Sequence, residues 1–118
     1  MTKQANMIDL LSAGIRGASV RQKVIAGNIA NAETPGFKRR VVEFEKALAK
    51  AMDRGDGLDG PVETKVQALA EGRTDATGNN VDLEVEIGEL VQNGANYKAY
   101  MRILNNVYKQ METAMTVQ

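Results

Sequence analysis

The sequence predicts a mainly α-helical protein, with two long helices from the chain ends packed as a coiled-coil-like pair and a small irregular middle that holds a short β element. Two observations lead to this fold class. Both ends of the chain carry regularly spaced apolar residues without proline, and both prolines lie in the middle. We therefore divide the 118 residues into an N-terminal helix at 1–32, a turn and irregular segment at 33–80, and a C-terminal helix at 81–118.

The N-terminal helix follows a heptad repeat. Apolar residues recur in alternating steps of three and four, which is the 3.5-residue repeat of a coiled coil. Gln22 is the polar member of this row, and such residues usually fix the register of paired helices at some cost in stability. Asn6 and Asp9 resemble a capping box, so we expect the helix to begin near Asn6. The expected seam residues are Ile8, Leu11, Ile15, Ala18, Gln22, Ile25 and Ile29.

The C-terminal helix shows the same repeat over a longer stretch. Acidic residues lie near its start and basic residues later, which suits the helix macrodipole. Between Val81 and Ile87, apolar and acidic residues also alternate with the period of a strand. The longer pattern favours a helix from about Asp82. The expected seam residues are Leu83, Ile87, Leu90, Gly94, Tyr97, Met101, Leu104, Tyr108 and Met111.

The middle segment contains shorter elements. Residues 41–52 predict an extended stretch followed by a short helix with Phe44, Leu48 and Met52 on one face. Residues 61–66 predict a short strand. Residues 71–80 are rich in turn-forming types.

The two seams allow two interpretations: helices that pack on each other within one chain, or helices that pack between chains. Glycines favour packing between chains. Each glycine in a helix interior costs roughly 0.8–1 kcal/mol relative to alanine, and close approach of neighbouring helices would compensate for that cost. The glycines inside the two helices are Gly14, Gly17, Gly27, Gly88 and Gly94.

Composition argues against an enzyme. The chain has no cysteine and no histidine, which removes a thiol nucleophile and the commonest general base. Acidic pairs such as Glu84 and Glu86 are expected in a solvated helix start, where carboxyl pKa values are not raised. No cofactor, metal or small-molecule substrate is expected. No apolar run approaches a membrane span, and the N-terminus lacks the apolar core of a signal peptide.

The most informative motif lies where the first helix ends. Pro35 cannot continue a helix, and Pro35-Gly36 suits the two central positions of a type II turn, where glycine takes a positive φ. Asn31 and Thr34 can satisfy loose backbone groups at the helix end, and Phe37 would anchor the exit against the helix. The motif residues are Asn28, Asn31, Thr34, Pro35, Gly36, Phe37 and Lys38.

These motif residues resemble the N-terminal signature of the bacterial flagellar rod, hook and axial proteins. The resemblance continues before the turn, after it and into the second helix, over about two-thirds of the chain, and is greatest for the proximal-rod members of the family. The residues that extend it are Met7–Leu11, Val41–Phe44, Leu48, Gly78–Glu84, Asn93, Tyr97 and Leu104–Asn106.

The resemblance implies a structural role. It implies that terminal helices of many copies, and of other rod subunits, pack into a helical tube that transmits torque from the motor to the hook. It further implies contacts with the membrane-ring junction protein and the flagellar export gate, a place in the periplasm-spanning rod of the basal body, and export without a cleaved signal peptide.

A small helix-turn-helix DNA-binding protein is the alternative function. Residues 21–40 offer a helix, a turn and basic residues, but Pro35-Gly36 falls where a recognition helix should start. The formal net charge of zero also speaks against nucleic acid as a partner. We interpret Lys38, Arg39 and Arg40 as a solvated turn or a subunit contact.

Overall fold

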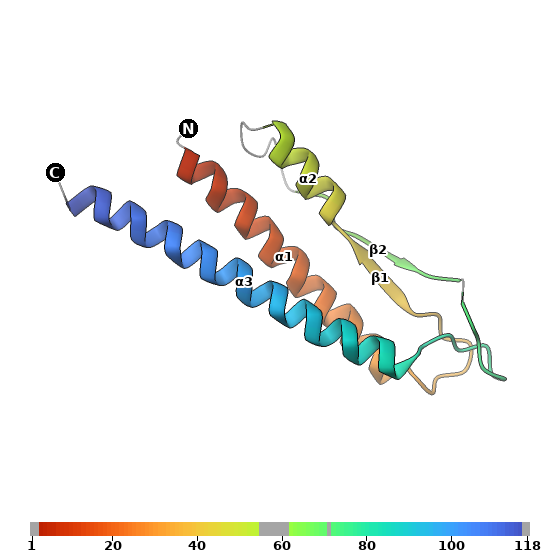
Figure 1. The fold of residues 1–118 in the computed structure, drawn as a ribbon. Coiled ribbons are helices and arrows are strands. Elements are labelled where there is room, and N and C mark those ends of the chain that lie inside the picture. The colour runs from red at the N-terminus through yellow and green to blue at the C-terminus, as the bar shows by residue number, and fades with distance from the viewer. Residues whose placement is uncertain (1–2, 55–61, 71, 117–118) are drawn as a thin grey trace.

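Two long antiparallel helices dominate the computed structural model, which describes residues 3–54, 62–70 and 72–116 (Figure 1). The elements in chain order are α1 (Lys3–Ala30), β1 (Arg40–Glu43), α2 (Glu45–Arg54), β2 (Lys65–Ala68) and α3 (Leu83–Thr116). The molecule is elongated, 67 × 24 × 15 Å, with both chain ends at the same end of the helix pair. The predicted fold class is therefore confirmed. Among the described residues, no helix is long and apolar enough to cross a membrane.

The start of each long helix tests one prediction. α1 already runs from Lys3, so the capping role predicted for Asn6 is wrong: Asn6 lies within the helix. α3 begins as predicted, because the Asp82 carboxylate accepts a hydrogen bond of 3.0 Å from the backbone N–H of Glu84. The helical period of the whole segment thus prevails over the short alternation at its start.

The small core lies between α1 and the middle segment, away from α3. Val42, Phe44 and Leu48 pack against Ala13 of α1. The Phe44 ring is 2% exposed, and a Cβ atom at Gly17 would lie only 2.5–2.6 Å from its ring atoms. Gly17 therefore leaves the space that the ring fills.

The residues predicted to share one face of the short helix are Phe44, directly before α2, and Leu48 and Met52 within it. Phe44 and Leu48 are buried, whereas Met52 is 56% exposed. Ala51, 2% exposed, takes its place because the steps from 44 to 48 to 51 keep one helical face toward α1.

β1 and β2 form a two-stranded antiparallel sheet with Val42 opposite Val66. The sheet lies beside α1, and all four residues of β2 are exposed. The strand predicted at 61–66 is displaced toward the C-terminus, to Lys65–Ala68, and Pro61 lies outside the described residues. The irregular stretch 72–80 leads from the sheet to α3 as predicted.

Candidate assembly interface

The turn after α1 has the predicted geometry. Gly36 has a φ of +73°, and the backbone N–H of Phe37 donates a 3.2 Å hydrogen bond to the carbonyl of Thr34. Pro35 and Gly36 therefore occupy the central positions of a type II turn. The turn also contacts the stretch before α3, because the N–H of Gly36 donates to the carbonyl of Thr77 at 2.9 Å.

Side chains close the C-terminal end of α1. The Asn31 amide donates to the carbonyl of Gly27 at 2.8 Å, which confirms its expected capping role. Thr34 instead donates its hydroxyl to the Asn31 side chain at 3.0 Å. Asn79, which has no predicted capping role, donates to the carbonyls of both Asn31 and Thr34 at 2.8 Å. The segment before α3 thus completes the cap of α1.

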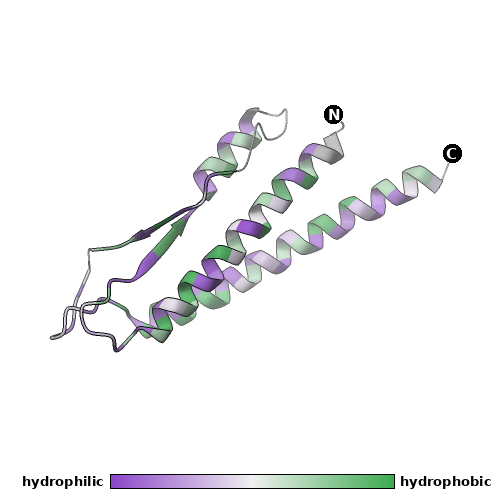
Figure 2. Cartoon of the chain, turned by 180° about the vertical axis from the view of Figure 1, so that it is seen from behind, coloured by the Kyte–Doolittle hydropathy of each residue, from purple (hydrophilic) through white to green (hydrophobic). Residues whose placement is uncertain are grey.

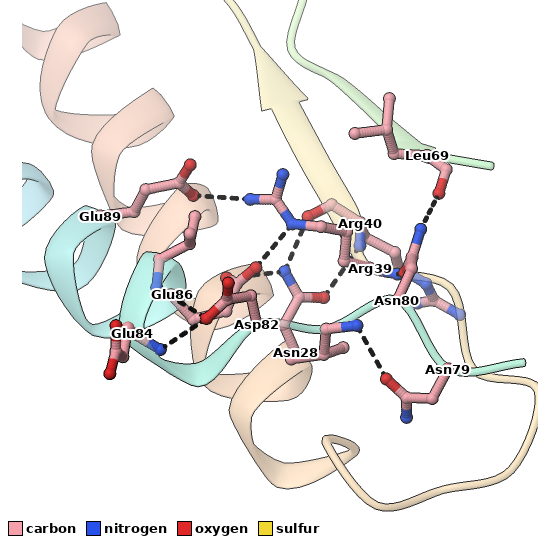
Figure 3. A network of polar contacts seen from close by, with 12 residues as sticks. Asn28, Arg39, Arg40, Leu69, Asn79, Asn80, Asp82, Glu84, Glu86 and Glu89 are labelled. Carbon is pink, nitrogen blue, oxygen red and sulfur yellow. Dashed lines mark hydrogen bonds and ion pairs between the residues drawn. The ribbon is translucent and has the colours of Figure 1, made fainter. Parts of the chain in front are cut away.

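Asn28 joins α1, β1 and α3 in one polar network (Figure 3). Its side chain is 1% exposed. The amide donates to the carbonyl of Arg40 at 2.8 Å and to the Glu86 carboxylate at 3.0 Å, and its oxygen accepts from the N–H of Arg40 at 2.9 Å. All the polar groups of this buried amide are therefore used for contacts between elements.

Glu86 and Arg39 form the charged centre of the network. Glu86 is fully buried, and its carboxylate lies 2.6 Å from Nε of Arg39, which also pairs with Glu89 at 2.9 Å. Burial acts to lower the pKa of the Arg39 guanidinium, but the hydrogen bond and charge of Glu86, helped by Glu89, outweigh it and raise the pKa. Each charge therefore has a partner, and removal of either one would leave the other with an unpaired charge in a buried or half-buried place.

Two interpretations from the sequence are wrong at this place. They are the solvated helix start for Glu86 and, of the two alternatives for Arg39, the solvated turn; the subunit contact stays a prediction. Both side chains are drawn together because the chain after the turn brings Arg39 to Glu86, which also contacts Asn28 of α1 (Figure 3). Of the basic stretch, Arg40 is exposed, and Lys38 donates to the carbonyl of Gly78. Phe37 is half-buried.

The predicted seam of α1 lies mostly toward the interior. Leu11, Ala18 and Ile25 are buried. The other apolar members, Ile8, Ile15 and Ile29, are half-buried. Gln22 is exposed, yet its side chain accepts a 2.9 Å hydrogen bond from Asn93 of α3. The polar member of the row thus contacts the partner helix.

The predicted seam of α3 is divided between two environments. Its half-buried members are Leu90, Gly94, Met101, Leu104 and Met111. Its exposed members are Leu83 (47%), Ile87 (52%), Tyr97 (39%) and Tyr108 (50%). Figure 2 shows hydrophobic residues along both terminal helices.

The residues of α3 that face α1 most directly lie one position earlier in the repeat. They are Glu86, Asn93, Tyr100 and Val107, and an apolar pattern misses this row because two of its members are polar. No recurring residue type marks the row in the sequence, because its four members differ in chemistry.

A metal site and a helix-turn-helix protein each require a specific arrangement of residues. Residues 3–54, 62–70 and 72–116 contain no group of three or more metal-ligating side chains. The chain after Pro35-Gly36 forms β1, so the described residues place a strand where a helix-turn-helix protein needs its recognition helix. Two long paired helices, locked together at one end by a turn and a polar network, define a structural subunit of a larger assembly.

Comparison with known proteins agrees with that class. The family model described as "Flagella basal body rod protein" matches residues 14–38. The flagellar basal body rod protein FlgB of Bacillus subtilis is 30% identical over 98% of both chains. FlgB of Aeromonas hydrophila is 35% identical over 75% of this chain and 76% of its own, and FlgB of Escherichia coli is 28% identical over 89% and 94%.

The chain belongs to the FlgB family of flagellar basal body rod proteins. It is a structural subunit of the proximal rod in the flagellar basal body and assembles with other flagellar rod components. Members of this family are structural components and not enzymes.

Proposed function

We propose that this subunit packs through its terminal helices into a helical tube that transmits torque from the motor to the hook. The observation that carries the proposal is an apolar stripe along the outer side of α3, which we define as Leu83, Ile87, Val91, Tyr97 and Tyr108. These side chains are 39–69% exposed in the single chain. Exposed apolar residues that recur along a helix are typical of a contact with another helix.

The stripe extends from the edge of the inner row, where Tyr97 is 39% exposed, to the outer side of α3, where Val91 is 69% exposed. The inner row binds α1, and the stripe is free to contact other subunits. A rod under torque needs neighbour contacts that resist sliding, and interdigitating apolar side chains supply such resistance. On this view the seam residues predicted for α3 serve two contacts, one within the chain and one between chains.

The turn motif would act as a rigid corner between the helices and the middle segment. Its support is the type II turn at Pro35-Gly36 and the cap that Asn79 completes. In this proposal residues 1–32 and 81–118 form the part of the subunit that enters the tube, and residues 33–80 lie outside it. The family resemblance further favours contacts with the membrane-ring junction protein and the export gate, a periplasm-spanning position, and export without a cleaved signal peptide.

One pair of variants tests the stripe. Ile87→Asp places a carboxylate in the proposed contact, but the position is half-exposed in the single chain, so the subunit should still fold. Ala99→Asp makes the same kind of change at an exposed position of α3 outside the stripe. We expect Ile87→Asp to abolish motility and rods in micrographs, because an unpaired buried charge costs several kcal/mol in every subunit.

Ala99→Asp cells should remain motile, and a blot should detect both variants at normal levels. Rods of normal length in Ile87→Asp cells would show that the stripe is not a subunit contact.

A further inference from the structure

Helices with a regular heptad repeat can slide past each other by seven residues without changing the apolar pattern. A slip of one heptad displaces one helix by about 10 Å, from the rise of 1.5 Å per residue. A subunit that carries torque would lose its shape by such a slip. The α1–α3 contact therefore needs a feature that makes one register unique.

The inner row of α3 has a different chemistry at each heptad. We call each residue of the row, together with the groups of α1 that it contacts, a layer. The first three layers hold the carboxylate of Glu86, the amide of Asn93 and the aromatic ring of Tyr100. The carboxylate of Glu86 meets the Asn28 amide at 3.0 Å. The amide of Asn93 donates to the Ala18 carbonyl at 2.8 Å and to Gln22 at 2.9 Å.

The third layer is steric. The Tyr100 ring lies over Gly14, where a Cβ atom would be 2.8 Å from the nearest ring atom. The fourth member of the row, Val107, is apolar and 9% exposed. The groups of α1 in these layers therefore also differ. They are the amide donor of Asn28, the acceptor oxygens of Ala18 and Gln22, and the space next to Gly14.

A slip in one direction would bring Glu86 to the place of Asn93. Its carboxylate would then face the Ala18 carbonyl, which is also an acceptor, and would lose Asn28 and Arg39. Asn93 would move opposite Gly14 and would lose both of its acceptors. Buried acceptors facing each other without a donor are strongly unfavourable.

A slip in the other direction would bring Tyr100 to the place of Asn93. Its ring would then lie over Arg21, seven residues after Gly14, and not over the space at Gly14. A Cβ atom at Gly14 would already lie 2.8 Å from the ring, so the Cβ atom and side chain of Arg21 leave the ring no room there. Both neighbouring registers are therefore excluded, each by a different layer.

We propose that Glu86 and Asn93 are register-specifying residues: they select one alignment of α1 with α3, at a cost in stability compared with apolar side chains. Buried polar residues in paired helices have this use in other systems. The value of a unique register for torque rests on the proposed function, but the register itself is a property of the single chain.

The test measures the alignment directly. The chain has no cysteine, so Lys23→Cys and Lys109→Cys provide the two labelling sites for nitroxides, both at exposed positions. The distance between the labels is measured by pulsed electron resonance on the purified, dilute subunit in trimethylamine N-oxide, which favours the folded chain. Circular dichroism monitors the helix content.

The parent should give one narrow distance. Glu86→Leu with Asn93→Leu makes both polar layers apolar, and Glu89 still pairs with Arg39. We expect the helix content to be kept and a second distance to appear, displaced by about 10 Å. Asn93→Leu alone keeps the Glu86 layer and should give a smaller second population.

The matched control is Asn105→Leu with Glu112→Leu. It makes the same two changes seven residues apart on α3, at exposed positions. The control should keep the single distance of the parent. An unchanged single distance in the Glu86→Leu/Asn93→Leu variant would overturn the proposal, whether or not the subunit forms rods.

Discussion

Two glycines of α1 should respond in opposite ways to the same substitution. Gly17 lies against Phe44, and a Cβ atom there would be 2.5–2.6 Å from three ring atoms. At Gly27, by contrast, a Cβ atom would have no such neighbour within 4 Å. Alanine at either site removes the helix penalty of glycine, a gain of roughly 0.8–1 kcal/mol.

At Gly27 nothing opposes this gain, so Gly27→Ala should stabilise the subunit by roughly 0.8–1 kcal/mol. At Gly17 the Phe44 ring must move, yet it is 2% exposed and belongs to the small core. Overpacking of this kind costs about 1–3 kcal/mol. Because the helix gain is common to both variants, their difference of about 1–3 kcal/mol isolates the ring contact.

Urea unfolding followed by circular dichroism measures that difference. The midpoints of the two variants should separate by on the order of 1 M urea, with Gly17→Ala lower. Equal midpoints would mean that the ring of Phe44 does not need the space at Gly17, and the steric explanation for this glycine would be wrong.

Three further predictions concern the turn, the seam and an ion pair. Gly36→Val forces a β-branched residue to a φ of +73° and should cost a kcal/mol or more, with loss of motility at normal expression. Ile15→Asp should abolish rods while Arg16→Ala, at an exposed position, should keep them; equal tolerance would contradict the α1 seam. Burial acts to raise the pKa of Glu45, but hydrogen bonds from Arg21 and two backbone N–H groups outweigh it and lower the pKa. Its contribution to stability should therefore be lost as the pH falls below about 4, and urea midpoints of Glu45→Gln should fall less over that range.

The helices and the turn could be predicted from local sequence. Heptad spacing over many residues is a strong periodic signal, and Pro35-Gly36 has few backbone conformations open to it. The start of α3 directly after Asp82, whose side chain caps the helix, followed from the same local chemistry.

Which faces are buried, and by what, depends on how the whole chain folds. The glycine pattern favours packing between chains, but Gly14 and Gly17 admit Tyr100 and Phe44 of the same chain. A small residue indicates that space is needed and does not indicate whose side chain fills it.

The polar centre is hidden from the sequence for a similar reason. Glu86 and Arg39 are 47 residues apart, and their separate surroundings in the sequence look solvated. The free energy of a buried charge depends on its partner, and the partner is known only when the chain has folded back on itself. Periodicity therefore fixes the elements, whereas contacts distant in the sequence fix the register and the buried polar network.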